Sequence, residues 1–322
     1  MSLLVFALDT TREYGARVAA HLGLPLGEHE EREFEDGEHK ARPLVDVRRR
    51  EVFVIHSLHG GSGRSPSDKL CRLLFFIGAL KDAGAERVTA VAPYLCYARK
   101  DRRTQSCDPI TTRYVAQLFE ASGADAVITC DVHNLAAFEN AFRCPTTNLE
   151  AIPLFVAHFA PLLRGEKIAV VSPDTGGIKR AERFRLALAE ALQEEPSAGF
   201  VDKRRSGGIV SGELLVAGDV RDRAVILFDD LISTGTTLRR AAQSCRTAGA
   251  AKVFAAATHG LFVEQAAAVL ADPVFQEVAV TDTVQSNAAQ AGTLPPNVVT
   301  LDSAKLVAEA IAAAYAGRQA SE

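Results

Sequence analysis

Short apolar runs rich in β-branched residues alternate with amphipathic stretches along nearly the whole chain, and this alternation limits the fold more than any other feature. The runs are apolar at almost every position, as expected for strands that helices cover on both faces of a parallel sheet. Between them, apolar residues recur at helical spacing. The alternation predicts an α/β fold with right-handed crossovers. The predicted strands are Val52–Ser57, Arg87–Ala92, Ala126–Val132, Ile168–Ser172, Ala224–Asp229, Val253–Thr258 and Glu277–Thr281.

Three glycines recur in the same local setting. Gly84, Gly123 and Gly249 each end a predicted helix just before a predicted strand. Glycine readily adopts the left-handed conformation that stops a helix at this position. Ordinary loop chemistry and a duplication of α/β domains both explain the repeat, and the pattern alone does not separate them.

The length of the chain favours two domains. It has 322 residues, and single hydrophobic cores stop growing at about 250–300 residues. We place the boundary in the stretch 148–153, which predicts an N-terminal domain over 1–150 and a C-terminal domain over 151–300. A final helix is expected within 301–322, packed on one of the two domains.

Composition argues against several classes of protein. The net charge is −4, whereas dedicated nucleic-acid binders are usually basic. No apolar window reaches the roughly 18 residues of a membrane span. The N-terminal residues do not have the shape of a signal peptide, so we expect a cytoplasmic protein. The six cysteines form no Cys-x-x-Cys pair, and we expect reduced thiols that lie mostly in the core.

The segment 225–238 is the most informative one for function. A predicted buried strand ends in Asp229 and Asp230, and a loop rich in glycine and hydroxyl groups leads into a helix. Backbone amides, hydroxyls and a helix N-terminus together favour a phosphate site. Adjacent carboxylates suit sugar hydroxyls or a hydrated Mg²⁺. A helix cap with a tight turn explains one hydroxyl residue but not the whole loop, which comprises Ser233, Thr234, Gly235, Thr236 and Thr237.

Several other polar motifs interrupt the apolar pattern. They are Phe34–Glu38, Val91–Arg102, Thr129–His133, Ser172–Arg180, Asp202–Arg205, Thr258–Gly260 and Val280–Thr283. The segment from Asp229 to Thr237 resembles the phosphoribosyl-diphosphate motif of type I phosphoribosyltransferases and of ribose-phosphate diphosphokinases. The other motifs, by their number and order, resemble those of the diphosphokinases over nearly the full chain. The resemblance implies two similar type I phosphoribosyltransferase-like domains, each a mainly parallel sheet flanked by helices.

The resemblance also implies an ATP site in the N-terminal half. Arginines offer forked donors and lysine a point charge to a triphosphate, and an aromatic ring suits adenine. From the residues alone, a solvated charge run around Arg99 and a loop anchor at Phe34 are the alternatives. The residues implied to bind ATP are Phe34, Asp36, Glu38, Arg99, Lys100, Asp101, Arg102 and His133.

Two residues at predicted strand ends are implied to contact Mg²⁺. His133 follows an apolar strand, where a neutral imidazole can bind a metal that carries nucleotide phosphates; a structural histidine is the alternative. Asp174 precedes a Gly-Gly pair and a predicted helix, so an N-cap is compatible with its ligand role. The residues implied to bind ribose 5-phosphate are Asp174, Asp229, Asp230, Ser233, Thr234, Gly235, Thr236 and Thr237.

Three basic residues, Lys203, Arg204 and Arg205, precede a flexible Ser-Gly-Gly stretch. Phosphoryl transfer is accelerated by positioning of the reactants and by positive charge placed where negative charge develops in the transition state. The resemblance implies that Lys203 and Arg205 are the catalytic pair, carried on a basic lid. An exposed basic hairpin is the alternative.

Four positions or segments differ from the best-known bacterial branch of that family. Ser233 stands where that branch has an acid in an Asp-Thr-Ala-Gly-Thr loop, and Lys100 stands where it has glutamine. The segment Thr104–Pro109 is shorter and less basic than the regulatory loop of that branch. The segment His59–Pro66 looks extended, and its glycines do not fit a Walker spacing, so we interpret it as a flexible loop near the nucleotide.

The implied activity is that of a ribose-phosphate diphosphokinase, which converts ATP and ribose 5-phosphate to 5-phosphoribosyl 1-diphosphate and AMP. Mg²⁺ is the implied cofactor. A homo-oligomer built from dimers, with a hexamer as one form, is implied because the family's ATP site is shared between subunits. Neither nucleic acid nor a membrane is an expected partner. A phosphoribosyltransferase that consumes the same diphosphate, and a non-catalytic regulatory paralogue, are the alternatives.

Overall fold

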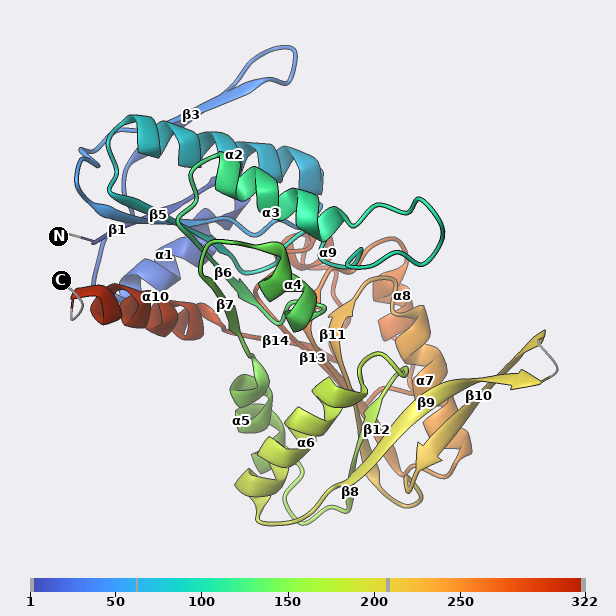
Figure 1. Cartoon of the computed structure of the whole chain (residues 1–322). Helices are drawn as coiled ribbons and strands as arrows, with labels where there is room; N and C mark the ends of the chain where they lie inside the picture. The colour runs from blue at the N-terminus through green and yellow to red at the C-terminus, as the bar shows by residue number, and fades with distance from the viewer. Residues whose placement is uncertain (1–2, 62, 207–208, 320–322) are drawn as a thin grey trace. The chain divides into compact units, whose positions relative to one another are not determined.

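The structure is a computed structural model that describes residues 3–61, 63–206 and 209–319, without the side chains of residues 203–206, 209–214, 290, 318 and 319. The chain forms two compact units (Figure 1). Unit 1 comprises Met1–Leu149, Thr283–Gln285 and Ser303–Glu322, and unit 2 comprises Glu150–Asp282 and Ser286–Asp302. The C-terminal helix therefore belongs to unit 1.

A parallel five-stranded sheet forms the centre of unit 1. Its strands lie in the order β1–β4–β5–β6–β7, and every neighbouring pair is parallel. Alternate residues of β4 enter different cores: Phe53 and Ile55 belong to one, and Val52 and Val54 to the other. The strands are β1 (Leu3–Ala7), β4 (Glu51–Ile55), β5 (Arg87–Ala92), β6 (Ala126–Cys130) and β7 (Thr146–Leu149).

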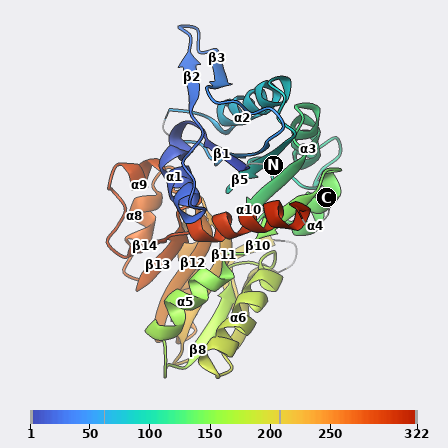
Figure 2. The ribbon, with the colours of Figure 1, turned by 90° about the vertical axis from the view of Figure 1, so that its left-hand side faces the viewer.

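Helices cover both faces of this sheet. On one face, α1 (Arg12–His21) and α10 (Ala304–Gln319) pack side by side (Figure 2). On the other face lie α2 (Pro66–Asp82), α3 (Thr111–Ala121) and α4 (Leu135–Ala141). Burial on both faces explains why these strands are apolar at almost every position.

Two strands of unit 1 lie outside this sheet. β2 (His29–Glu33) and β3 (His39–Pro43) form an antiparallel hairpin that, among the described strands, pairs only with itself. Its side chains are mostly polar and partly or fully exposed. The apolar patterning that predicts the other strands is therefore absent here.

Unit 2 is built around a seven-stranded sheet in the order β10–β9–β8–β11–β12–β13–β14. β9 and β10 are antiparallel, and all other neighbours are parallel. On one face lie α7 (Thr236–Thr247) and α8 (Ala266–Leu270), and on the other α5 (Ile152–Leu162) and α6 (Ile178–Leu192). The strands are β8 (Ile168–Ser172), β9 (Ser197–Ser206), β10 (Ile209–Gly218), β11 (Ala224–Ile232), β12 (Lys252–Gly260), β13 (Glu277–Thr281) and β14 (Val298–Leu301).

The predicted α/β class is confirmed, and a strand lies at each of the predicted apolar runs. Gly84, Gly123 and Gly249 have φ angles of +89°, +93° and +99°, which confirms their role as helix stops. The patterning did not single out β1, β7, β14 or the hairpins β2–β3 and β9–β10. β7 and β14 have 4 residues each, too few for a clear pattern. Among the described residues, no helix combines the length and apolarity needed to cross a membrane.

Candidate active site

Two carboxylates lie at the end of a central strand of unit 2. β11 runs between β8 and β12, and parallel strands present their carboxyl ends to ligands. Near this end Asp230 is buried, whereas the side chain of Asp229 keeps 24% of its exposure. One guanidinium joins them, because Arg180 Nη1 of α6 lies 3.1 Å from Oδ1 of each aspartate. The strand end thus carries an acidic pair that a single cation half neutralises.

The protonation of this pair is set by its surroundings. Burial and the negative charge of Asp230 raise the pKa of Asp229 to about 8, although Arg180 opposes the shift. The backbone amide of Asp230 also donates to Asp229 Oδ1 over 2.9 Å. An acid held in this way favours a ligand that donates hydrogen bonds or brings positive charge.

The loop after β11 enters α7 at a glycine. Gly235 has a φ of +76°, and a Cβ there would lie 3.1 Å from Val269 Cγ1, so conformation and space both favour glycine. As the N-cap of α7, Gly235 has no side chain with which to cap the helix. Thr234 Oγ1 donates to Thr236 Oγ1 over 3.2 Å. The first-turn amides of α7 and the hydroxyls of residues 233–237 are together suited to an anion.

Asp174 folds back onto its own loop between β8 and α6. Its Oδ1 accepts hydrogen bonds from the amides of Gly176 and Gly177 over 2.8 Å and 3.1 Å. The loop packs tightly, because a Cβ on Gly177 would lie 2.7 Å from Ser172 Oγ. This turn accounts for the cap-like sequence around Asp174, and the ligand role of Asp174 stays a prediction.

The predicted catalytic pair lies on β9. The backbone register pairs Lys203 with Leu214 and Arg205 with Val210 across the β9–β10 hairpin. Residues two apart lie on the same face of a strand, so the backbone places both basic residues on one face. Their side chains lie outside the described part of the structure, and their catalytic role stays a prediction.

Phe34 lies at the tip of the β2–β3 hairpin in unit 1. The Phe34 amide donates to the Glu38 carbonyl over 2.8 Å, and the Glu38 amide donates to Asp36 Oδ1 over 3.0 Å. The Arg32 guanidinium lies over the Phe34 ring, 5.1 Å from its centroid. The tip therefore presents an aromatic ring, a cation and acidic side chains together.

The residues of the basic segment after β5 differ in exposure and in pairing. Arg99 and Arg102 are exposed, although Arg102 Nε lies 3.8 Å from Asp101 Oδ1. Lys100 Nζ lies 2.5 Å from Asp108 Oδ2, and this interaction with other hydrogen bonds from the loop holds the pKa of Asp108 well below its usual range. The two arginines are therefore more open to an anion than Lys100 in this structure.

A hydrogen bond joins the loops that follow β5 and β6. Asn134 Nδ2 donates to Asp101 Oδ2 over 2.5 Å, and Asn134 Oδ1 accepts from the Ala137 amide at the start of α4. His133, directly before Asn134, is exposed, whereas Asp131 is buried. The structure thus brings together two of the segments predicted to bind ATP, at the carboxyl edge of the unit 1 sheet.

The sequence interpretation missed the role of Arg180. This residue ends the Ser172–Arg180 motif, but its contact with the acidic pair depends on how α6 packs beside β11. A signal was present, because positive charge is unfavourable in the first turn of a helix and Lys179 and Arg180 both lie there. A conflict of this kind points to a carboxylate partner from elsewhere in the fold.

Comparison with known proteins covers both units. Residues 3–123 match the N-terminal domain of ribose phosphate pyrophosphokinase, and residues 210–321 match the phosphoribosyl synthetase-associated domain. A ribose-phosphate pyrophosphokinase of Haemophilus influenzae is 38% identical over 308 residues, which are 95% of this chain and 94% of that protein. One of Caldanaerobacter subterraneus is 36% identical over 283 residues, 88% of this chain and 86% of that protein.

A solved structure agrees with these matches. The crystal structure of phosphoribosylpyrophosphate synthetase from Mycobacterium smegmatis has a TM-score of 0.88 and 32% identity, and the match covers 98% of this chain and all of that one. The chain belongs to the ribose-phosphate pyrophosphokinase family. The family resemblance of the motifs is thereby confirmed, and the chain is an enzyme of this family. The roles of individual site residues of this chain stay predictions.

Proposed function

We propose that the chain transfers the β,γ-diphosphoryl group of Mg-ATP to the anomeric hydroxyl of ribose 5-phosphate, giving 5-phosphoribosyl 1-diphosphate and AMP. The observation that carries the proposal is the carboxyl end of β11. There, Asp229 and Asp230 are followed within a few residues by Gly235 and the start of α7. Acceptors for sugar hydroxyls and donors for a phosphate thus lie in one short segment.

On the sugar side, the guanidinium of Arg180 affects which ligands can bind to Asp229 and Asp230. A positive charge already lies between Asp229 and Asp230, so a dication bound at the same oxygens would be repelled by it. Sugar hydroxyls, which donate hydrogen bonds and bring no charge, suit the pair better. Residues 233–237 bind the 5-phosphate in this proposal, and Asp174 adds a contact to the sugar or its metal.

On the nucleotide side, the proposal uses residues of unit 1. The Phe34 ring suits the face of adenine, and the neighbouring carboxylates of Asp36 and Glu38 suit its polar groups. The exposed guanidiniums of Arg99 and Arg102 suit the phosphates. Lys100 supports this segment by pairing with Asp108 of the same loop, and Asp101 does so by accepting a hydrogen bond from Asn134 of the loop after β6.

The reaction joins one oxygen to phosphorus and releases another. The anomeric hydroxyl of the sugar attacks the β-phosphorus and loses its proton, while the bond from the β-phosphorus to the α,β-bridging oxygen breaks. That oxygen leaves as part of AMP. Because such transfers depend on positioning and on charge stabilisation, we assign Lys203 and Arg205 to the negative charge that develops on the transferred group.

Mg²⁺ enters this proposal as part of the substrate Mg-ATP. In the part of the chain that the structure describes, no three His, Cys, Asp or Glu side chains gather into a metal site. Mg²⁺ bound with phosphates typically takes only one or two protein ligands and keeps several waters. His133, exposed after β6, is the residue that we expect to contact the metal of the nucleotide. Asp174 is expected to contact the sugar or its metal.

We extend the proposal to assembly and location. A homo-oligomer built from dimers is supported by large apolar side chains exposed on unit 1, among them Phe75, Tyr114 and Leu118. A cytoplasmic location is supported by the six cysteines, none of which forms a disulfide in the part of the chain that the structure describes.

The test is AMP formation from ATP and ribose 5-phosphate in the absence of a nucleobase. A phosphoribosyltransferase would form no AMP under these conditions, and a non-catalytic paralogue would bind ATP without turnover. We expect Lys203→Ala to lose most of kcat, and Lys167→Ala, which removes an exposed lysine of unit 2, to retain it. Normal turnover in Lys203→Ala would overturn the assignment of the catalytic pair.

A further inference from the structure

The hairpin that carries Phe34 needs external support. A two-stranded hairpin is marginally stable by itself, and within the described part of the chain β2 and β3 pair with no third strand. Near its base, the Gly27 amide donates to the Val5 carbonyl over 2.7 Å. At the tip end, His39 is the cross-strand partner of Glu33, and its ring stacks on Phe75 of α2 with centroids 5.6 Å apart. The orientation of the tip therefore depends on this stacking and on what binds Glu33, the residue directly before Phe34.

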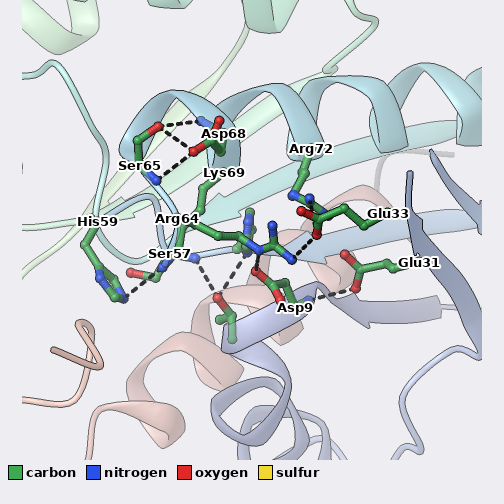
Figure 3. Close-up of polar contacts among 12 residues, drawn as sticks. Asp9, Glu31, Glu33, Ser57, His59, Arg64, Ser65, Asp68, Lys69 and Arg72 are labelled. Carbon is green, nitrogen blue, oxygen red and sulfur yellow. Dashed lines mark hydrogen bonds and ion pairs between the residues drawn. The ribbon is translucent and has the colours of Figure 1, made fainter. Parts of the chain in front are cut away.

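Glu33 is held by two arginines that lie outside the hairpin, Arg64 and Arg72 of α2 (Figure 3). Its Oε2 accepts from Arg64 Nη2 over 2.7 Å and from Arg72 Nη2 over 3.1 Å. Arg64 belongs to the His59–Pro66 loop, which the sequence interpretation treats as flexible. Within the described part of this segment, the amides of Gly61 and Arg64 each donate to the other's carbonyl, and Ser65 forms a capping box with Asp68. Ser62 lies outside the described residues.

Arg64 also binds Asp9, just after β1, so it links the hairpin to the segment that follows β1. Its Nε donates to Asp9 Oδ2 over 2.7 Å, and Asp9 lies in the short helix η1 (Asp9–Thr11) that follows β1. The amide of Asp9 donates to Glu31 Oε1 over 2.8 Å. The carboxylates of Glu31 and Glu33, two residues apart on one face of β2, are therefore tied to the same small group (Figure 3).

The direction of the Phe34 side chain can be inferred from these contacts of Glu31 and Glu33, because side chains alternate between the two faces of a strand. If Glu31 and Glu33 face the body of unit 1, residues 32 and 34 face the other way. The Arg32 guanidinium over the Phe34 ring agrees with this alternation. The direction of the ring is thus coupled to the ion pair between Glu33 and Arg64.

We infer that Arg64 is a positioning residue for the nucleotide: it holds Glu33 and so aims the Phe34 tip. The inference rests on the proposed function, in which this tip contacts adenine. Arg64 itself touches no substrate in this account. Its loss should therefore raise KM for ATP more than it lowers kcat, with KM for ribose 5-phosphate unchanged.

The test compares Arg64→Ala with Arg42→Ala. Arg42 is a matched control because it forms an ion pair with Glu30 within the same hairpin, over 2.5 Å, and does not tie the hairpin to another element through that pair. In Arg64→Ala we expect hydrogen exchange of residues 33–38 to rise and KM for ATP to rise about 5- to 20-fold, which corresponds to roughly 1–2 kcal/mol. Arg42→Ala should change neither quantity by more than about twofold. Arg64→Lys keeps the charge but not the fork, and we expect an intermediate KM for ATP.

The outcomes separate this inference from the proposed function. Unchanged hydrogen exchange at the tip in Arg64→Ala would overturn the inference. A looser tip with an unchanged KM for ATP would also overturn it, and Phe34→Ala then shows where the error lies. If Phe34→Ala raises KM for ATP, only the role of Arg64 is wrong. If Phe34→Ala leaves KM for ATP unchanged, the proposed adenine contact is wrong as well.

Discussion

The acidic strand end of unit 2 and the Phe34 hairpin of unit 1 hold their side chains by different means. Asp229 and Asp230 lie near the end of a strand that β12 pairs along one edge, and the guanidinium beside them is largely buried. Phe34 lies on an isolated hairpin whose tip is held by a partly exposed ion pair. Burial makes the first region rigid whatever the solvent contains, whereas the second depends on charges that solvent can screen.

The largest expected effect is on the buried side of this comparison. Asp229→Asn keeps the shape of the side chain but replaces one acceptor oxygen for the sugar with an amide donor, while the contact of Asp230 with Arg180 remains. A buried polar group left without its hydrogen-bond partner costs about 1–3 kcal/mol, so we expect kcat/KM for ribose 5-phosphate to fall about 5- to 150-fold. Steady-state kinetics with saturating ATP measure it.

The control is Asp219→Asn, the same change at an exposed aspartate of unit 2 that pairs with Arg223 over 2.6 Å. It should leave kcat/KM within about twofold of the wild type. Equal losses in both variants would mean that the acidic pair has no special role.

A somewhat smaller effect is expected at the turn into α7. Gly235→Ala places a side chain at a φ of +76° and brings its Cβ to 3.1 Å from Val269. Strain of this kind costs about 1–3 kcal/mol, and relief by rotation of the loop should raise KM for ribose 5-phosphate about 10-fold.

Gly165→Ala is a control that separates the general effect of backbone strain from a specific effect on the loop before α7. Gly165 has a similar φ of +80°, and nothing lies within 4 Å of a Cβ placed there. Its substitution should lower the melting temperature slightly and leave KM unchanged. If Gly165→Ala raises KM as much as Gly235→Ala does, the effect is general strain rather than a distorted phosphate loop.

The raised pKa of Asp229 predicts a pH effect on stability. An acid whose pKa rises from 3.8 to about 8 on folding binds more protons in the folded state between these values. Its contribution to the free energy of unfolding is therefore present at low pH and is lost as pH rises through this window. Asn does not titrate, so relative to the wild type Asp229→Asn should become more stable by about 1 kcal/mol or more between about pH 5 and about pH 8. Parallel pH profiles from urea denaturation would contradict the raised pKa.

The smallest effect tests screening directly. Raising salt from about 0.05 M to about 1 M shortens the Debye length from more than 10 Å to about 3 Å. Hydrogen exchange of residues 33–38 should rise severalfold, while exchange of residues 225–232 should stay constant. A similar change in both segments would remove the contrast between the two regions.

The sequence predicted the buried region better than the exposed one, for a physical reason. β11 is apolar up to Asp229, so the acidic pair near its end stands out in the sequence. Gly235 has a positive φ angle at the start of a helix, a conformation that favours glycine. The β2–β3 hairpin has no apolar period, because water and ion pairs rather than a core surround it. The contacts of Arg64 and Arg180 are with residues far away in the sequence, and they form only when the chain is packed. These contacts therefore could not be predicted from local sequence patterns.

The central claim is transfer of a diphosphoryl group from ATP to a pentose phosphate bound at β11. Phosphorus NMR of the full chain with ribose 5-phosphate and ATP carrying a heavy-oxygen label in the α,β-bridge tests it most directly. We expect 5-phosphoribosyl 1-diphosphate to form in step with AMP and the label to appear wholly in AMP, with both products reduced in Asp229→Asn. Label in released diphosphate, or the absence of AMP, would contradict the account.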